Sequence, residues 1–360
     1  MKIFILFNHP APYKVKLFNG LSQKHDVHVI FERLKNKDRN RLFYDERTIN
    51  FHIHPIKGLS IGDENHLSLG AMKHLKKNNY DLIIINGYST LTEMLTLRYL
   101  KKHRIPYAFY INGGVAKKES KIKSRIKRYF LSGAKFYFSP STKADDYLLK
   151  YGVTPEQIYH FPYSTVYEHQ LAKVAATKKE KLAFWQDKNI NQAKVLVTVT
   201  SFIPRKNNFE LIKCWSTMPQ DYGLVLIGDG KEKQKYLKYI KEHHLSNVHI
   251  LPFMKSCDAL EFVRHSDGAL YISRYDIYGH VINEALAMGA NVLASDRMVA
   301  TKALITDDVN GLVFDYQSSL RDKILQLVKK NFFSAAISTA RNNTIEMMVA
   351  RHLEIIEEAK

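Results

Sequence analysis

Residues 273–289 read S-R-Y-D-I-Y-G-H-V-I-N-E-A-L-A-M-G and lie between two short apolar runs. The runs on either side, residues 267–272 and 291–295, have the length and composition of buried strands. The stretch between them predicts a turn followed by a helix that begins near His280. A strand, a turn, a helix and a second strand in this order are typical of a parallel α/β unit.

The turn and the start of this helix carry residues that suit an anionic ligand. Free N–H groups at a helix start attract anions, and a glycine there lets a phosphate approach the backbone closely. Gly279, His280 and Val281 occupy that position. Glu284 lies one turn into the helix, where its carboxylate can accept hydrogen bonds from hydroxyl groups, and Asp276 precedes the turn. On spacing alone, two solvated acids are the more frequent explanation of such a pair.

The same stretch resembles the nucleotide-sugar-binding signature of the family 4 retaining glycosyltransferases. In that signature, two acids separated by seven residues flank a glycine near a helix start, and E-A-hydrophobic-A-x-G follows. The matching residues here are Asp276, Gly279, Glu284, Ala285, Ala287 and Gly289. The first acid of the family is usually glutamate, so the shorter Asp276 departs from the pattern. The resemblance implies that Glu284 holds the ribose of the donor and that Asp276 faces the reacting sugar as a catalytic residue.

The alternation of strands and helices extends along nearly the whole chain and predicts an α/β fold. A chain of 360 residues is long enough for two domains with separate cores. Strand patterns occur at residues 2–8, 27–31, 51–54, 81–85, 107–111, 136–139, 158–161, 195–200, 224–228, 248–251, 268–272, 291–295 and 312–314. Helical patterns separate most of them, so we expect mainly parallel sheets covered on both faces.

Residues 162–181 show no strand pattern, which places a domain boundary near Ser164. The resemblance implies the GT-B fold, in which two doubly wound, Rossmann-like domains face each other across a cleft. We therefore expect residues 1–164 to form the acceptor-side domain and residues 165–340 to form the nucleotide-sugar-binding domain. The last segment, residues 341–360, should be a helix that crosses back to the N-terminal domain.

The second half offers two further donor-binding candidates. Family members carry Gly-Arg at positions 200–201 and a lysine at the position of Lys206, and these cations grip the donor diphosphate. The early arginine is absent here, so we expect Lys206 and the adjacent Arg205 to meet the charge of the leaving group. Gly228 and Asp229 belong to a G-D-G sequence that resembles a nucleotide-facing turn of the family, although a tight strand-to-helix turn explains it equally well.

Two loops of the first half resemble those of a subgroup that acts in bacterial capsule, exopolysaccharide and O-antigen synthesis. One is G-Y-S-T at residues 87–90, and the other is Asn112-Gly113-Gly114, where the subgroup has Asp-Gly-Gly. The amide of Asn112 thus replaces a carboxylate. His9 follows the first strand and also fits that subgroup, although a single histidine there is more often structural. These residues are our candidates for acceptor-side loops.

The chain is strongly basic, with 54 Lys+Arg against 35 Asp+Glu and a formal net charge of +19. Such a field favours an anionic partner. Residues 33–41 read as a mobile basic loop, whereas residues 117–128 combine bases with apolar residues at helical spacing, which suits an anionic lipid surface. An ordinary helix packed on the sheet is the alternative. The candidate membrane-surface residues are Lys117, Lys118, Lys121, Lys123, Arg125, Lys127 and Arg128.

No stretch approaches the ~18 apolar residues of a membrane span, and the first ten residues read as a strand rather than a signal. We therefore expect a cytoplasmic protein that is peripheral on the inner face of the cell membrane. Cys214 and Cys257 show no metal or redox spacing and are expected to be reduced, buried thiols. The sixteen histidines show no zinc-type spacing, and the family resemblance implies neither a metal nor a cofactor.

Together these features predict a retaining glycosyltransferase, a hexosyltransferase that moves a sugar from a nucleotide diphosphate sugar, with UDP favoured, to a lipid-linked glycan acceptor in cell-surface polysaccharide synthesis. Its partners would be the donor, the acceptor and an anionic membrane, without nucleic acid. Two alternatives remain: a nucleotide-sugar epimerase of similar fold, and a non-catalytic basic subunit that binds a membrane or nucleic acid. The acid pair and E-A-L-A-M-G favour transfer, and the chain lacks a nucleic-acid recognition motif.

Overall fold

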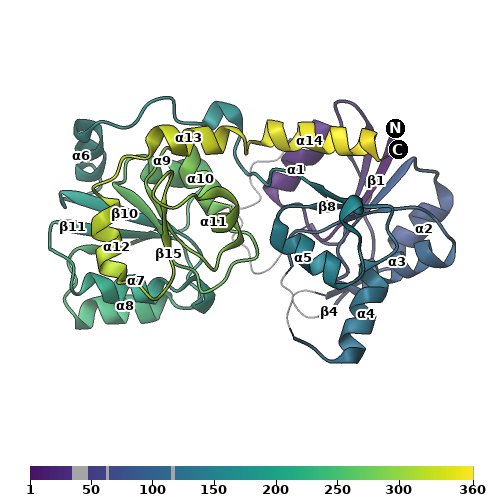
Figure 1. Cartoon of the computed structure of the whole chain (residues 1–360), viewed down its shortest axis with the longest axis horizontal. Coiled ribbons are helices and arrows are strands. Elements are labelled where there is room, and N and C mark those ends of the chain that lie inside the picture. Colours follow the sequence, from purple (N-terminus) through teal and green to yellow (C-terminus); the bar gives the residue numbers. More distant parts are fainter. Residues whose placement is uncertain (35–47, 62–64, 115–117, 360) are drawn as a thin grey trace. The chain divides into compact units, whose positions relative to one another are not determined.

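The computed structural model describes residues 1–34, 48–61, 65–114 and 118–359. The chain forms two compact units (Figure 1). Unit 1 consists of Met1–Tyr163 together with Ile345–Lys360, and unit 2 consists of Ser164–Thr344. The chain therefore leaves unit 1 once, builds all of unit 2 and returns to unit 1.

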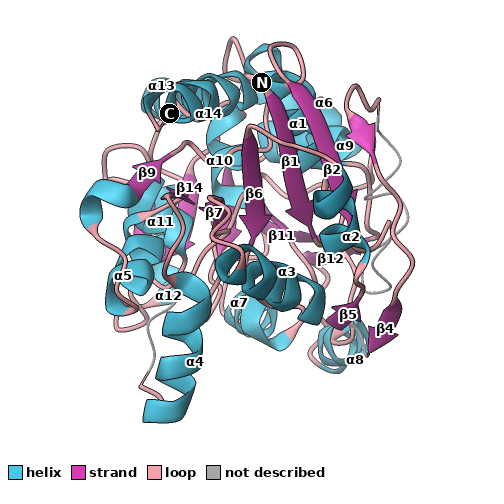
Figure 2. Ribbon diagram, turned by 90° about the vertical axis from the view of Figure 1, so that its right-hand side faces the viewer, coloured by secondary structure: helices cyan, strands magenta, loops and turns pink. Residues whose placement is uncertain are grey.

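Unit 1 is built on a seven-stranded sheet with the order β3-β2-β1-β6-β7-β8-β9, and all of its strand pairs are parallel. Figure 2 shows β2, β1 and β6 side by side. The strands are β1 (Lys2–Phe7), β2 (Asp26–Phe31), β3 (His52–Ile53), β6 (Leu82–Asn86), β7 (Ala108–Tyr110), β8 (Phe136–Ser139) and β9 (Ile158–His160). The helices are α1 (Pro12–Leu21), α2 (Gly70–Lys77), α3 (Leu91–Lys102), α4 (Lys121–Leu131), α5 (Thr142–Lys150) and α14 (Ile345–Glu358).

The central strands of unit 1 read as continuous apolar runs because helices cover both faces of the sheet. Helix α14 packs against α1, where a Cβ atom on Gly20 would lie 2.4 Å from Val349. The ring of His352 in α14 is buried and stacks on Tyr110 and Phe138 of the sheet. The C-terminal helix is thus part of the core of unit 1.

Unit 2 contains a six-stranded parallel sheet with the order β12-β11-β10-β13-β14-β15. Its strands are β10 (Lys194–Val199), β11 (Tyr222–Ile227), β12 (Val248–Leu251), β13 (Gly268–Tyr271), β14 (Val292–Ser295) and β15 (Leu312–Phe314). Its helices are α6 (Lys178–Gln186), α7 (Asn208–Trp215), α8 (Lys233–Glu242), α9 (Ser256–Arg264), α10 (Val281–Ala287), α11 (Val299–Leu304), α12 (Leu320–Leu327) and α13 (Phe333–Arg341). Fully buried side chains such as Leu224, Leu270 and Trp215 form its core.

Both sheets are doubly wound, so the predicted α/β class is confirmed. In each sheet the strand order reverses beside the first strand of the unit, between β1 and β6 in unit 1 and between β10 and β13 in unit 2. Ligands of such folds bind outside the carboxyl ends of the strands at this reversal. In unit 2, the segments that follow β10 and β13 contain Lys206 and Asp276.

Some local predictions were wrong or incomplete. Cys257 is exposed near the start of α9 and Cys214 is only partly buried, so the expectation of two buried thiols is wrong. A short antiparallel hairpin, β4 (Leu59–Ile61) with β5 (Asn65–Leu67), was not predicted. Most of the basic segment 33–41 lies outside the described residues. Within the described part of the chain, none of the helices combines the length and apolarity needed to cross a membrane.

Candidate functional site

The segments that follow β10 and β13 bring three predicted site residues together. A short 3₁₀ turn, Pro204–Lys206, begins with proline and ends where Asn207 adopts a left-handed φ of 59°. This turn directs Arg205 and Lys206 towards Asp276. Nη1 of Arg205 lies 2.9 Å from Oδ1 of Asp276, and Nζ of Lys206 donates to Oδ2. The two loops are also joined through their backbones, since the N–H of Arg274 donates to the carbonyl of Arg205.

This trio is a compact charge cluster with one anion and two cations. Asp276 is buried, Lys206 is nearly so and Arg205 is partly exposed. Burial alone would raise the pKa of the Asp276 carboxyl, but the charges of Lys206 and then Arg205 hold that pKa below its usual value. The carboxylate is therefore ionised at neutral pH. Any anionic ligand that binds Lys206 and Arg205 must compete with it.

The turn that follows Asp276 requires glycine at its end. Gly279 has a φ of +103°, which other residues adopt only with strain, and a Cβ atom there would lie 2.7 Å from Met298. Helix α10 starts directly afterwards with Val281, and His280 is its N-cap residue. The helix is held in unit 2 by Asn283, whose amide donates to Ser164 and to the carbonyl of Asn343.

Glu284 lies one turn into α10 and is half-buried. Its Oε1 atom accepts a hydrogen bond of 2.8 Å from the hydroxyl of Thr165. This contact fixes the direction of the carboxylate, so Glu284 presents a defined acceptor rather than a freely rotating acid. Thr165 was missed in the sequence because no local pattern connects it with a helix that begins more than a hundred residues later.

The G-D-G turn after β11 has a structural explanation. A Cβ atom on Gly228 would lie 1.9 Å from the carbonyl oxygen of Thr200, and one on Gly230 would lie 2.5 Å from that of Phe202. Both glycines also have positive φ angles. The Asp229 carboxylate is exposed, with Lys233 3.8 Å away. The close approach of this turn to the segment after β10 accounts for the glycines, and a role in nucleotide binding stays a prediction.

A pocket of about 500 Å³ lies beside the charge cluster and was not predicted. Asn207, Arg274, Arg297 and Tyr316 line part of it. Nε of Arg274 donates to Asn207 over 3.1 Å, and the Arg297 guanidinium lies over the Tyr316 ring at 4.1 Å. Two further arginines thus lie at the carboxyl edge of the same sheet. Arg274 lies in the stretch 273–289 but is not one of the residues that match the family signature, and Arg297 lies outside it.

In unit 1, the acceptor-side candidates lie in well-packed loops. The amide of Asn112 donates to Asn86 over 2.7 Å and accepts from the Tyr163 hydroxyl over 3.0 Å. Gly113 has a φ of 148°, and a Cβ atom on Gly114 would meet the Tyr147 ring at 2.6 Å. His9 follows β1 and is half-buried. These packing contacts explain the loops locally, and their acceptor role remains a prediction.

A buried acid pair lies at the same edge of unit 1 and was missed. Glu32 accepts a hydrogen bond from the Thr90 hydroxyl over 2.7 Å, and Glu93 accepts one from the Ser89 N–H over 2.7 Å. Burial, assisted by the charge of Glu93, raises the pKa of Glu32, and burial raises the pKa of Glu93. Both carboxyl groups therefore bind protons at a higher pH than solvent-exposed acids do.

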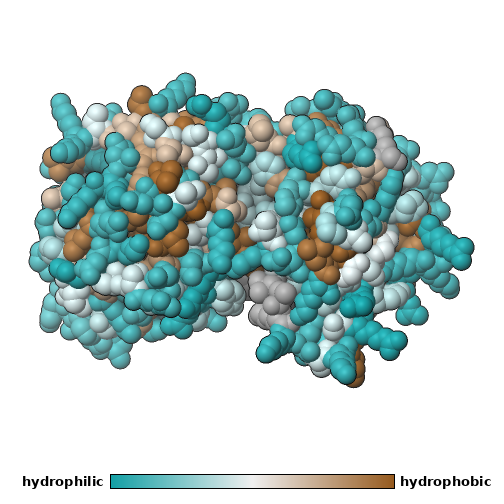
Figure 3. Space-filling model, viewed as in Figure 1, coloured by the Kyte–Doolittle hydropathy of each residue, from teal (hydrophilic) through white to brown (hydrophobic). Residues whose placement is uncertain are grey.

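Helix α4 differs from the packed-helix alternative. Ile122, Ile126 and Tyr129 are 74%, 50% and 45% exposed, and Leu131 is the only buried residue of the helix. Figure 3 shows a mostly hydrophilic surface over the projecting end of α4, with an apolar patch at its tip. Apolar and basic side chains therefore share the exposed surface of α4.

The basic residues of this segment differ in their surroundings. Lys127 is directed towards the body of unit 1, where its Nζ lies 2.6 Å from Glu119, a contact that raises the pKa of Lys127. The other described bases are exposed to solvent: Lys118, Lys121, Lys123, Arg125 and Arg128. Lys117 lies outside the described residues.

Comparison with known proteins finds family models for both halves of the chain. The model for glycosyl transferases group 1 matches residues 180–345, and the model for glycosyltransferase family 4 matches residues 15–163. Together they cover most of both units.

Curated relatives align over shorter segments. The amylovoran biosynthesis glycosyltransferase AmsD of Erwinia amylovora is 29% identical over 161 residues, which are 42% of this chain and 45% of the relative. An uncharacterized glycosyltransferase of Methanocaldococcus jannaschii is 28% identical over 132 residues, 36% of this chain and 37% of the relative. The chain thus aligns with less than half the length of each of these relatives.

Solved structures match over the whole chain. The Anabaena protein HepE, crystallised in complex with UDP, superposes with a TM-score of 0.76 at 17% identity, covering 99% of this chain and 100% of HepE. Sucrose-phosphate synthase from Thermosynechococcus elongatus gives 0.76 at 15% identity, covering 99% of each chain. These neighbours confirm the predicted GT-B fold.

Proposed function

The chain belongs to the family 4 glycosyltransferases, and we propose that it transfers a sugar from a UDP-sugar to a glycan acceptor with retention of the anomeric configuration. The observation that carries this proposal is the cluster of Arg205, Lys206 and Asp276 at the strand reversal of unit 2, directly before the helix that holds Glu284. UDP is favoured because HepE, which shares the fold, was solved with UDP and with UDP-glucose.

Lys206 and Arg205 would stabilise the diphosphate as it leaves. The bond between the anomeric carbon and the phosphate oxygen breaks, and negative charge grows on that oxygen. Fixed cations in a partly dry site are effective against such charge. The hydroxyl of the acceptor attacks the face from which the diphosphate departs, and its proton passes to the departing phosphate oxygen. We assign the charge compensation to these two side chains, so this scheme needs no divalent metal at the donor.

Asp276 and Glu284 would hold different parts of the donor. When the diphosphate pairs with Lys206 and Arg205, the Asp276 carboxylate loses its cationic partners and can accept hydrogen bonds from the donor sugar. Glu284 is already fixed by Thr165 and would accept from the ribose hydroxyls. Gly279, His280 and Val281 form the entry to α10, where backbone N–H groups favour the phosphates.

We further propose that the acceptor is lipid-linked and that unit 1 binds the membrane through α4, at the cytoplasmic face, in cell-surface polysaccharide synthesis. The support is the exposed combination of Ile122, Ile126 and Tyr129 with neighbouring bases. An amphipathic basic helix of this kind lies in the interface of anionic lipid, and each base near the surface adds about 1 kcal/mol.

The transfer proposal is tested by incubating the protein with UDP-sugars and a lipid-linked glycan acceptor and determining the anomeric configuration of the product by NMR. We expect UDP release, one new glycosidic bond and the same configuration as in the donor. Release of UDP without a glycosidic product, or an inverted product, would contradict the proposal. Epimerised donor without transfer would identify the chain as an epimerase.

The membrane proposal is tested by flotation with vesicles that contain anionic lipid. Replacing Lys121, Lys123 and Arg125 by Gln should weaken binding, and raised salt should have the same effect. The control variant replaces exposed bases of unit 2 instead, Lys178, Lys179 and Lys238, so that net charge falls equally. If both variants lose binding alike, the effect comes from overall charge and α4 is not the docking element.

A further inference from the structure

The edge of the unit 1 sheet brings an acid and two histidines together, far from any sequence motif. Asp26 and His28 are two residues apart on β2, so their side chains lie on the same face of the sheet. His28 pairs directly with His52 of the neighbouring parallel strand β3, and the two rings stack with centroids 4.8 Å apart. Sheet register therefore joins residues that are 24 positions apart in the sequence.

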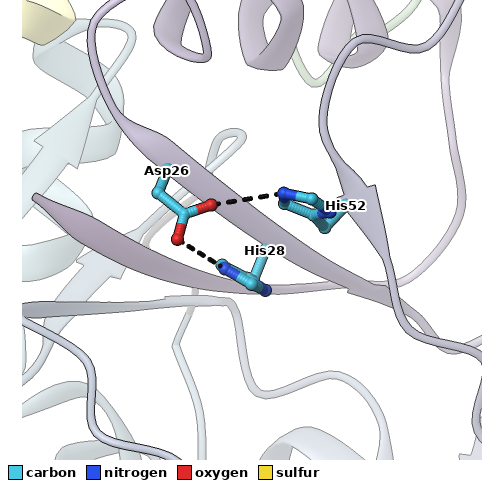
Figure 4. Close-up of side chains that lie close together, drawn as sticks. All are labelled: Asp26, His28 and His52. Atoms are coloured by element: carbon cyan, nitrogen blue, oxygen red, sulfur yellow. Dashed lines mark ion pairs between the residues drawn. The ribbon is translucent and has the colours of Figure 1, made fainter.

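The atoms of these three side chains that can bind a metal ion lie close together (Figure 4). Nε2 of His28 lies 3.0 Å from Oδ2 of Asp26, and Nε2 of His52 lies 3.4 Å from Oδ1 of Asp26. One ligand atom from each residue lies within 4.8 Å of the other two. A tetrahedral zinc ion with bonds of about 2.0–2.2 Å requires its ligand atoms to lie roughly 3.3 Å apart. Small rotations of the exposed Asp26 and His52 side chains would satisfy this.

The surroundings of His28 favour a cation between the rings and the carboxylate. Nδ1 of His28 lies 2.8 Å from Nε2 of His54, and Nε2 of His28 faces the Asp26 carboxylate. In the tautomer that donates Nδ1–H to His54, Nε2 directs a lone pair towards the Asp26 carboxylate, whereas in the other tautomer Nε2–H donates to that carboxylate. The first tautomer is the one that can bind a metal ion between Nε2 and the carboxylate. A histidine ligand that donates its other ring N–H to the protein is the usual arrangement in metal sites.

The solvent exposure and the chemical type of the three side chains also suit a metal ion. The side chains of Asp26 and His52 are 49% and 66% exposed, so an ion can enter from solvent, whereas His28 is only 12% exposed and supplies a fixed ligand. Two imidazoles and one carboxylate are a zinc-type donor set, with water as the fourth ligand.

We propose that Asp26, His28 and His52 bind one zinc ion and that this ion fastens the edge strand β3 to β2. Strand β3 has only two residues, and one further ladder bond, from the His54 N–H to the carbonyl of Val29, extends its pairing with β2. A bond from each strand to a common ion would reinforce this short pairing. The site lies within unit 1 and does not involve the residues assigned to the sugar donor. The zinc proposal can therefore be tested separately from the proposed glycosyl transfer.

The test uses the full-length protein without an affinity tag, treated with EDTA and dialysed, and titrated with ZnCl₂ by calorimetry. We expect one zinc per chain at micromolar or lower dissociation constant, a rise in Tm and, with Co²⁺ in place of zinc, the visible absorption of a tetrahedral site. His52→Gln and Asp26→Asn should each weaken zinc binding at least tenfold. His103→Gln removes an exposed histidine from the same unit and should leave binding unchanged.

Two further measurements make the outcome decisive. In EDTA, the His52→Gln and Asp26→Asn variants should melt at the wild-type temperature, which shows that lost binding is not lost folding. Zinc should also slow hydrogen exchange of the His54 amide several-fold in the wild type and not in His52→Gln. If both ligand variants bind zinc as tightly as the wild type does, the proposed site is wrong. If zinc binds but hydrogen exchange at residues 52–54 does not change, the proposal that the ion fastens β3 to β2 is wrong.

Discussion

Asp276→Asn should tighten the binding of free UDP while it slows transfer. In the structure the Asp276 carboxylate pairs with Lys206 and Arg205, the two cations assigned to the donor diphosphate. UDP must displace this internal anion before it can bind them. Asparagine keeps the shape of the side chain and removes its charge, so the competition disappears. The same change removes the carboxylate that we assign to the donor sugar, so turnover should fall.

The size of the effect follows from the exposure of each cation. A hydrogen bond to a charged group contributes about 1.5–3 kcal/mol net. Arg205 is 31% exposed, so solvent screens its ion pair with Asp276. The free energy that UDP must overcome therefore comes mainly from the contact of Asp276 with Lys206, which is 11% exposed. Since about 1.4 kcal/mol corresponds to a factor of ten, UDP should bind roughly tenfold more tightly to the variant. Without UDP the variant should melt at a lower temperature, because Lys206 loses its pairing with the Asp276 carboxylate, and UDP should restore much of that loss.

Calorimetry with UDP, beside melting curves and transfer rates, measures all three quantities. Glu284→Gln should weaken UDP binding, because Glu284 is assigned to the ribose. Asp187→Asn is the matched control, since Asp187 is an exposed acid of unit 2 whose nearest described cation is Lys188, 3.2 Å away. It should change neither affinity nor rate. If Asp276→Asn weakens UDP as much as Glu284→Gln does, the carboxylate is part of the nucleotide site and the competition argument is wrong.

Three other outcomes are expected. Lys206→Ala should lower turnover about 100-fold or more in the same transfer assay, because it removes the less exposed of the two cations assigned to the leaving group; an unchanged rate would shift that role to Arg205. Lys14→Met should raise the free energy of unfolding by about 1–3 kcal/mol. Lys14 is fully buried beside the Tyr110 ring, its Nζ makes no hydrogen bond to any described residue, and burial lowers its pKa well below the usual value. A lower Tm of the variant in thermal melts would contradict this. Burial, with help from the charges of Lys14 and Arg351 and against the hydrogen bond to the Met348 carbonyl, lowers the pKa of His352 to about 3. Below about pH 6.5 the unfolded chain therefore binds a proton at this histidine that the native chain does not bind. Stability should therefore fall by about 1.4 kcal/mol for each pH unit between 6.5 and 3 on account of this group, and denaturant melts of His352→Phe should show a shallower fall than the wild type.

Sequence alone predicts the architecture because buried parallel strands leave a local signal. Runs such as residues 3–7 and 195–197 are apolar on both faces, and helical spacing separates them. The rule that ligands bind at the carboxyl ends of strands then directs attention to Asp276 and Lys206 before any coordinates are available. The sequence thus indicates that both residues lie at the same edge of the sheet, and their functional roles remain predictions.

What the sequence does not contain is the pairing between distant loops. Asp276 is 71 positions from Arg205, and nothing local indicates that one carboxylate holds both cations. The same applies to Asp26 and His52, which only the register of β2 and β3 brings together. Cys257 shows a different limit. Whether this small residue near the start of α9 faces the core or the solvent depends on the rotation of the helix about its axis, and a single cysteine in the sequence does not indicate that rotation.

The return of α14 to unit 1 also orders the folding of the chain in time. Unit 2 is one continuous segment, so every contact of its core is available once residue 344 has been synthesised. Unit 1 must wait longer, because the surface of α1 around Gly20 and the aromatic stack of Tyr110 and Phe138 are covered by α14. During synthesis, the half of the protein that is made first is therefore the half that matures last. Its incomplete core would be a natural substrate for chaperones, and a chain that stops before residue 345 should contain a folded unit 2 joined to an unfinished unit 1.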